Sequence, residues 1–244
     1  MTEIRTEEIM IAAIAQMLSG LSHVAVGAAS PIPGSAALLA RELSGGRMRV
    51  SLLGRITQPT FTDGGRELFD CAAQGRIDAF FLSGVQIDGQ ANINLVYIGD
   101  PDSPKARFPG SFGSAYLYFL VPRVILFRQE HTPRTLVEKV DFVSAPGSSD
   151  ENVYRPGGPH GLVTGRCVFG FDKDLGRFRI ESVHPGHTLD EIREQTGFEF
   201  DVPSTGVEET PQPEKAWLQL IRGPVGDEIR EVYPGFAKKM FDSA

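Results

Sequence analysis

Short apolar runs alternate with amphipathic stretches of helical length in the first third of the chain. The runs at residues 23–27, 48–53 and 77–82 are apolar on both faces, so we expect them to be buried strands. A stretch of helical periodicity precedes each of them, at residues 6–21, 34–43 and 64–75. Strands buried on both faces that alternate with helices predict an α/β fold with an open, mostly parallel sheet flanked by helices.

The pattern changes in the middle of the chain. Gly, Asn, Asp and Pro crowd residues 87–110, which predicts hairpins and exposed loops. A helix near Ser114–Leu120 and a strand at residues 123–127 follow. Residues 162–171 and 177–183 then predict an antiparallel strand pair.

The last part of the chain begins with a helix from residue 188, where a Thr can cap the helix N-terminus, and this helix ends before residue 197. Residues 205–215 are polar and rich in Glu and Pro, which is typical of an exposed linker. The chain is therefore expected to form one domain over residues 1–204, followed by a polar linker and a C-terminal helical extension over residues 205–244.

Composition narrows the class of protein. The chain has 244 residues, of which 41% are hydrophobic and 23% charged, as in an ordinary globular domain with one sizeable core. A formal net charge of -7 argues against a nucleic acid or an anionic membrane as partner. The most apolar N-terminal run, residues 9–15, follows two glutamates and not a basic segment, so we expect a cytoplasmic protein without a membrane span.

The two cysteines, Cys71 and Cys167, lie far apart in the sequence. They fit a reducing compartment, and each is expected to be a buried structural thiol. No group of His, Cys or Asp has the spacing of metal ligands, so no metal is expected.

Three segments carry a family resemblance. Residues 81–94 read FLSGVQIDGQANIN, similar to a G-A-x-Q-V-D-x-x-G-N-x-N segment. Residues 108–115 read FPGSFGSA, similar to a glycine-rich turn before a helix, and residues 182–188 with 196–198 are similar to an L-H-P-G-V-T … T-G-F ending. Their order and spacing resemble the beta subunits of family I coenzyme A transferases, over roughly residues 21–202.

The resemblance implies an open α/β sheet and an alpha-type partner subunit, in an alpha2beta2 assembly. It also implies coenzyme A, bound as an acyl-CoA substrate whose pantetheine arm enters a site between the subunits. In the family, a glutamate attacks the thioester, because a covalent intermediate divides one difficult step into two easier ones.

This chain departs from the family at the nucleophile. The family glutamate follows the second strand, and residues 51–54 read Ser-Leu-Leu-Gly, which places Leu52 at that position. A leucine cannot be acylated, so we expect binding of the thioester without classical transfer. The family's Gly-x-Gly-x-Pro turn reads Gly-Ala-Ala-Ser-Pro at residues 27–31, with Ala29 in place of the second glycine.

The candidate catalytic residues come from the end of the third predicted strand. Parallel sheets bind ligands at this edge, where Gln86 and Ser83 are the candidate catalytic residues. Gln86 or nearby N–H groups would polarise the thioester carbonyl, and Gly84 would permit close approach. The alternative is a tight connection from a strand to a turn.

Glycine-rich turns supply the candidate CoA-binding residues. The turn before residue 114 would present backbone N–H groups to an anionic or carbonyl oxygen, or would simply cap the helix. The full expected set is Gly27, Gly54, Gly84, Gly110, Ser111 and Gly113.

Three functions remain open on these grounds. The first is an acyl-CoA enzyme without covalent transfer, which hydrolyses, cleaves or decarboxylates its substrate with a base from the alpha subunit. The second is a true CoA transferase with an atypical nucleophile. The third is a non-catalytic partner subunit.

Overall fold

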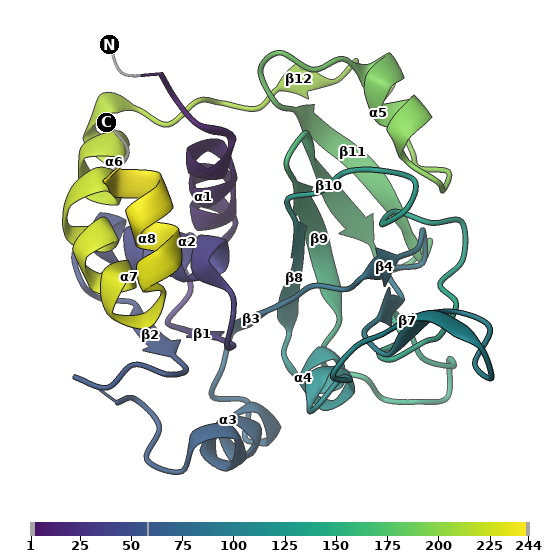
Figure 1. The fold of residues 1–244 in the computed structure, drawn as a ribbon, viewed down its shortest axis with the longest axis horizontal. Coiled ribbons are helices and arrows are strands. Elements are labelled where there is room, and N and C mark those ends of the chain that lie inside the picture. The colour runs from purple at the N-terminus through teal and green to yellow at the C-terminus, as the bar shows by residue number, and fades with distance from the viewer. Residues whose placement is uncertain (1–2, 58, 243–244) are drawn as a thin grey trace. The chain divides into compact units, whose positions relative to one another are not determined.

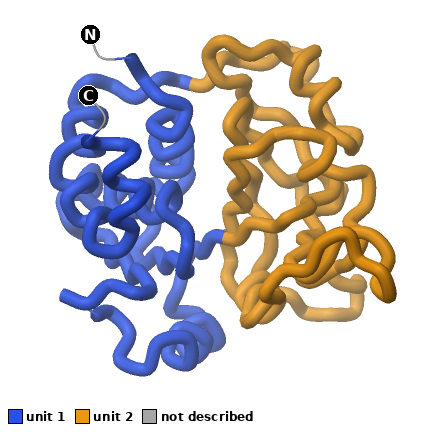
Figure 2. Tube along the Cα trace, in the orientation of Figure 1, with its two compact units in different colours: residues 1–81, 211–244 blue, residues 82–210 orange. Residues whose placement is uncertain are grey.

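The structure is a computed structural model that describes residues 3–57 and 59–242. The chain divides into two compact units, coloured separately in Figure 2. Unit 1 combines Met1–Phe81 with Pro211–Ala244, and unit 2 is Leu82–Thr210. The predicted domain boundary after residue 204 stays a prediction.

Unit 1 has the predicted alternation of strands and helices (Figure 1). Its strands are β1 (His23–Val26), β2 (Arg49–Leu52) and β3 (Ala79–Leu82), and β1 pairs with both of the others in parallel. Its first three helices are α1 (Thr6–Met17), α2 (Pro31–Leu43) and α3 (Gly64–Ala73). The whole of β1 and β3 is buried, as two-sided apolar runs require.

Two helix boundaries differ from the expectation. Helix α2 begins at Pro31 and not at Gly34, because the fixed φ of proline suits the first helical position and its missing N–H costs nothing there. Helix α1 ends at Met17, short of the expected residue 21, and Gly20 then turns the chain with φ +79°.

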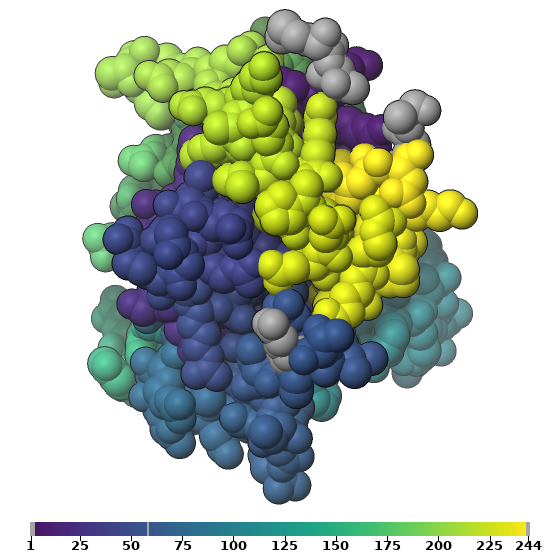
Figure 3. Space-filling view, turned by 90° about the vertical axis from the view of Figure 1, so that its left-hand side faces the viewer, coloured from purple at the N-terminus to yellow at the C-terminus, as the bar shows by residue number. Residues whose placement is uncertain are grey.

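The C-terminal residues complete unit 1 with more helix than expected. They form α6 (Lys215–Leu220), the π-helical turn η1 (Ile221–Val225), α7 (Gly226–Val232) and α8 (Pro234–Phe241). Helix α2 contacts α6, η1 and α7. Figure 3 shows these C-terminal residues, in yellow-green and yellow, beside the dark blue residues of α2.

One buried carboxylate joins the two ends of the chain within unit 1. Glu8 on α1 is 1% exposed, and its two oxygens accept hydrogen bonds from Arg222 Nε at 2.6 Å and Nη2 at 2.8 Å. This bidentate pair satisfies a charge that would otherwise be costly to bury.

Unit 2 is built on a mixed sheet in the order β12-β11-β10-β9-β8. The strands are β8 (Arg123–Arg128), β9 (Pro159–Thr164), β10 (Cys167–Asp172), β11 (Arg177–Val183) and β12 (Glu208–Glu209). The pairs β8–β9 and β11–β12 are parallel, whereas β9–β10 and β10–β11 are antiparallel.

The expected hairpins and helices of unit 2 are present. The hairpins pair β4 (Gln86–Ile87) with β5 (Ile93–Asn94) and β6 (Tyr97–Gly99) with β7 (Pro104–Arg107). The helices are α4 (Ser114–Leu120) and α5 (Leu189–Gln195), and Thr188 caps α5 by accepting a hydrogen bond from Glu191 N.

The prediction of one strand over residues 162–171 was wrong. The chain turns after Thr164, whose hydroxyl oxygen accepts hydrogen bonds from the backbone N–H groups of Arg166 (3.2 Å) and Cys167 (3.1 Å). Such a side-chain bond competes with the strand ladder and starts a turn. The run is therefore two strands, and the predicted antiparallel pair with residues 177–183 is formed by β10 alone.

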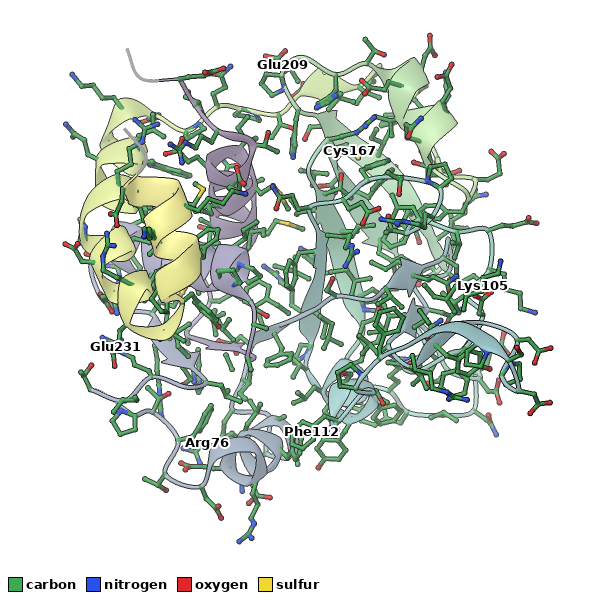
Figure 4. The ribbon with its side chains drawn as sticks, in the orientation of Figure 1. Arg76, Lys105, Phe112, Cys167, Glu209 and Glu231 are labelled. Carbon is green, nitrogen blue, oxygen red and sulfur yellow. The ribbon has the colours of Figure 1, made fainter. Side chains whose placement is uncertain are left out.

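The imidazole of His184 and the thiol of Cys167 are buried next to this turn. His184 Nε2 donates to Thr164 O at 2.9 Å, and its Nδ1 lies 2.8 Å from Thr210 Oγ1, so the neutral ring has both partners that it needs. Burial disfavours the imidazolium and lowers the pKa of His184 to about 4. Cys167, labelled in Figure 4, is also fully buried, and burial raises the pKa of its thiol to about 12.

We predict that His184 makes unit 2 sensitive to acid. The unfolded chain takes up a proton near pH 6.5 that the folded chain excludes until about pH 4, so the free energy of unfolding falls as pH drops through this window. The variant His184→Gln keeps a donor and an acceptor but cannot titrate. Urea unfolding between pH 7.5 and 4.5 should therefore give a shallower pH dependence for the variant, and equal slopes would contradict the prediction.

Candidate functional site

The carboxyl ends of β1 and β2 lie side by side in unit 1. Val26 is the register partner of Leu52, so the chain leaves both strands at the same edge. Gly27 follows β1, and a methyl group in place of its hydrogen would lie 3.3 Å from Phe80 Cζ. Gly54 follows β2 with φ +90°, a conformation that favours glycine. This edge is where parallel α/β sheets bind ligands.

The turn after β1 is held from the C-terminal segment. Ala29 has φ +55°, which costs a residue with a Cβ atom roughly 1 kcal/mol. The hydroxyl of Tyr233 donates to Gly27 O at 3.1 Å and accepts from Ser30 N at 3.4 Å, so it bridges the turn on both sides of Ala29.

Leu52, at the predicted nucleophile position, is a packing residue. It is 2% exposed. A methyl group added at Gly34 would lie 3.1 Å from Ile229 Cδ1, 3.4 Å from Tyr233 Cε2 and 3.5 Å from Leu52 Cδ2. The three side chains thus converge on α2 at Gly34, which places the Leu52 side chain against the C-terminal helices.

The loop after β2 is held by two glutamates of α7. Glu231 Oε1 accepts hydrogen bonds from Ile56 N (2.9 Å) and Thr57 N (2.7 Å), while Oε2 accepts from Thr57 Oγ1 (2.6 Å). The bonds from Thr57 hold the pKa of the Glu231 carboxyl below its ordinary value. Glu228 Oε2 pairs with Arg55 Nη2 at 2.9 Å. Figure 4 labels Glu231.

The predicted catalytic residues of unit 2 lie at the β4–β5 hairpin. Gln86 is 6% exposed, and its Oε1 accepts from Asn94 Nδ2 (2.7 Å) and Asp141 N (3.0 Å), while its Nε2 donates to Asp141 Oδ2 (3.0 Å). Both ends of the amide are therefore engaged within the unit. Ser83 is half-buried, and its hydroxyl makes no hydrogen bond to another described residue. The catalytic assignment of the two residues stays a prediction.

Gly84 is required by the hairpin itself. A methyl group at this position would lie 2.6 Å from Gln86 O, closer than side-chain carbons are found, and 3.1 Å from Asn94 O, which is also a tight contact. This contact favours the tight connection that the sequence left as an alternative, and a role in CoA binding stays a prediction.

The second glycine-rich turn precedes α4. Gly110 has φ +100°, Phe112 has φ +44° with 87% exposure, and Ser114 N donates to Ser111 O at 2.8 Å. Gly113 is the N-cap residue of α4. Figure 4 labels Phe112 beside this helix.

Helix α4 is tied to the first hairpin, because the hydroxyl of Tyr118 donates to Ala91 O at 2.9 Å. The structure thus joins the two predicted segments of unit 2 through one buried hydrogen bond. CoA binding by Gly110, Ser111 and Gly113 stays a prediction.

Sequence reasoning missed Glu228, Glu231 and Tyr233, which hold the loops of unit 1. Their segment carries a helical pattern, but no local signal shows that a helix will dock at a sheet edge. Among residues 3–57 and 59–242, no group of three or more His, Cys, Asp or Glu side chains is arranged to hold a metal ion. No helix in the described part of the chain is long and apolar enough to cross a membrane.

The turns at these strand ends lie in the segments that resemble coenzyme A transferases, and the sequence comparison agrees. Residues 2–195 match the family described as Coenzyme A transferase, and the chain belongs to that family.

The curated relatives include enzymes of different activities. The chain is 34% identical over 155 residues to the beta-type subunit of 3-oxoadipate CoA-transferase from Pseudomonas knackmussii, covering 61% of this chain and 58% of the relative. It is 33% identical over 164 residues to the beta-type subunit of glutaconate CoA-transferase from Acidaminococcus fermentans, covering 64% and 58%. The cholesterol ring-cleaving hydrolase IpdB subunit of Rhodococcus jostii is 32% identical over 162 residues, covering 64% and 62%. The chain thus spans less than two thirds of the length of each of these relatives.

Solved structures share the fold over nearly the whole chain. Glutaconate coenzyme A-transferase from Acidaminococcus fermentans gives a TM-score of 0.81 at 23% identity, covering 100% of this chain and 99% of that one. Rhodococcus jostii IpdAB gives 0.79 at 27% identity, covering 95% and 99%. The decarboxylase AibA/AibB gives 0.76 at 23% identity, covering 99% and 100%.

We predict that Leu52 stabilises unit 1. Replacing it with Ala removes buried methyl groups beside Ile229, which should lower the free energy of unfolding by about 2–4 kcal/mol. Leu53→Ala, at the half-buried next position, is the matched control and should cost less. Urea denaturation of both variants measures the difference, and equal losses would show that the packing at Leu52 is not special.

Proposed function

We propose that this chain is the beta subunit of a heteromeric cytoplasmic acyl-CoA enzyme, assembled with an alpha-type subunit as alpha2beta2. The enzyme hydrolyses, cleaves or decarboxylates an acyl-CoA thioester and forms no covalent intermediate on this chain. The observation that carries the proposal is the buried hydrocarbon side chain of Leu52 at the end of β2, where the family resemblance puts an acylated glutamate.

The carboxylates near this strand end do not replace that glutamate. Glu231 accepts three hydrogen bonds from the loop after β2, and Glu228 pairs with Arg55 and Arg41. A carboxylate engaged in this way is a poor nucleophile, because attack on a carbonyl would require it to give up charge-assisted bonds. The described residues at this edge therefore favour a reaction without an acyl-enzyme.

In the hydrolytic version of this reaction, the oxygen of water bonds to the thioester carbonyl carbon and the carbon–sulfur bond breaks. The proton lost by water protonates the departing thiolate, so that the products are a carboxylic acid and CoA. We assign the base that carries this proton to the alpha subunit. On this chain, Ser83 polarises the carbonyl, and Gln86 holds the hairpin that follows Ser83 in the chain.

The relatives fit this proposal in part. IpdB is named as a subunit of a ring-cleaving hydrolase and AibA/AibB as a decarboxylase. Two relatives at 33% and 34% identity are named as transferase subunits, and they favour the alternative of a CoA transferase with an atypical nucleophile.

Borohydride trapping decides between these two functions. The chain is coexpressed with its alpha-type partner, incubated with acyl-CoA and reduced, and its peptides are weighed by mass spectrometry. We expect release of CoA without an added acceptor acid, and no reduced adduct on this chain. An adduct on a carboxylate of this chain would establish the transferase and overturn the proposal.

Substitutions of Ser83 and Gln86 should differ in their effect on the stability of the protein. Ser83→Ala removes a half-buried hydroxyl, so we expect turnover to fall about 10- to 100-fold with little change in thermal stability. Gln86→Ala leaves Asp141 N without its acceptor and removes one of the two acceptors of Asn94 Nδ2, so it should also lower the free energy of unfolding by roughly 1–3 kcal/mol. Full activity in Ser83→Ala would remove this serine from the mechanism.

A further inference from the structure

We propose that residues 231–233, called the brace from here on, position the two loops that bind the acyl-CoA substrate at the carboxyl edge of β1 and β2. Glu231 and Tyr233 are the positioning residues. This inference rests on the proposed function and adds to it the device that shapes this half of the substrate site.

The first contact of the brace fixes the loop after β2. Ile56 N and Thr57 N have no strand partner, and Glu231 accepts hydrogen bonds from both. The same carboxylate binds the Thr57 hydroxyl. Three donors on one carboxylate set the direction of the loop where it leaves the strand, because each bond restricts a different group.

The second contact fixes the turn after β1. The hydroxyl of Tyr233 donates a hydrogen bond to Gly27 O and accepts one from Ser30 N. Between these two residues lies Ala29 in the left-handed region, where the family resemblance puts a glycine. A turn with an unfavourable backbone conformation keeps its shape only when its surroundings hold it.

The two contacts move together because they belong to one segment. Val232 lies between Glu231 and Tyr233, and its Cγ1 would be 3.7 Å from a methyl group at Gly54. Ile229 packs toward Gly34 on α2, and Glu228 pairs with Arg41 of the same helix. A shift of the brace would therefore change both loops at once. Figure 3 shows the blue residues after β2 beside the yellow C-terminal helices.

Ligands of parallel α/β sheets bind outside the carboxyl ends of the strands. Here a segment more than 170 residues away in the sequence forms part of the support of that edge. Since Glu231 and Tyr233 are occupied by backbone groups, they act on substrate through the loops and not by direct proton transfer.

The test compares acyl-CoA kinetics of the complete complex with the alpha subunit for four variants of this chain. Glu231→Ala and Tyr233→Phe should raise KM for acyl-CoA about tenfold and leave kcat within about threefold, because the loops lose their orientation while the reacting groups remain. Glu231→Gln should restore KM to within about twofold, since its amide oxygen still accepts from both N–H groups and its NH2 can donate to the Thr57 hydroxyl.

Arg230→Ala is the matched control. Arg230 lies next to Glu231 on α7, but its guanidinium pairs with the exposed Asp242 at 2.9 Å and does not contact either loop. Its KM should equal that of the wild type. A KM unchanged in Glu231→Ala and Tyr233→Phe, or raised equally in Arg230→Ala, would overturn the inference.

Amide hydrogen exchange of Ile56 and Thr57 tests the brace independently of enzyme activity, and so independently of the proposed function. In Glu231→Ala, both amides should exchange at least about tenfold faster than in the wild type, whereas Arg230→Ala should leave them unchanged. Unchanged exchange in Glu231→Ala overturns the brace whatever the activity. A wild-type complex that turns over no acyl-CoA overturns the proposed function and, with it, the assignment of these loops to substrate.

Discussion

The parallel pairing of β1 with β2 is the constraint on which the candidate site of unit 1 depends. Because Val26 lies opposite Leu52, two connections must leave the sheet at one edge within a short distance. Each connection then needs a special conformation, which Ala29 adopts on one side and Gly54 on the other. Glu231 of α7 holds the connection after β2, and Tyr233, the residue that follows α7, holds the turn after β1, so the fold of the last thirty or so residues is inseparable from the geometry at this edge.

Most of the fold could be predicted, because two-sided apolar runs and helical periodicity are local properties of a sequence. The failures have local causes as well. The turn at Thr164 depends on a side-chain oxygen that accepts two backbone N–H groups, and the apolar pattern continues through it unchanged. The edge strand β12 consists of two exposed glutamates, which carry no signal of a strand.

The candidate site could be predicted only in part. The backbone demands at Gly84 and Gly110 follow from glycines in a motif, and the structure gives each a steric or conformational reason. The hydrogen-bond partners of Gln86 could not be predicted, since Asp141 lies 55 residues away in the sequence. Tyr233 contacts Gly27 across 206 residues, and no periodicity in a single sequence reports which helix docks on which turn.

The bond between Glu8 and Arg222 has a consequence for the order in which the chain takes shape on the ribosome. Unit 1 is discontinuous in the sequence. Its buried Glu8, near the N-terminus, pairs with Arg222, which is translated 214 residues later. Unit 2 lies wholly between the two halves and has all its own residues before that cation emerges. We therefore expect the first half of unit 1 to complete its packing only after Arg222 has been translated, near the end of synthesis.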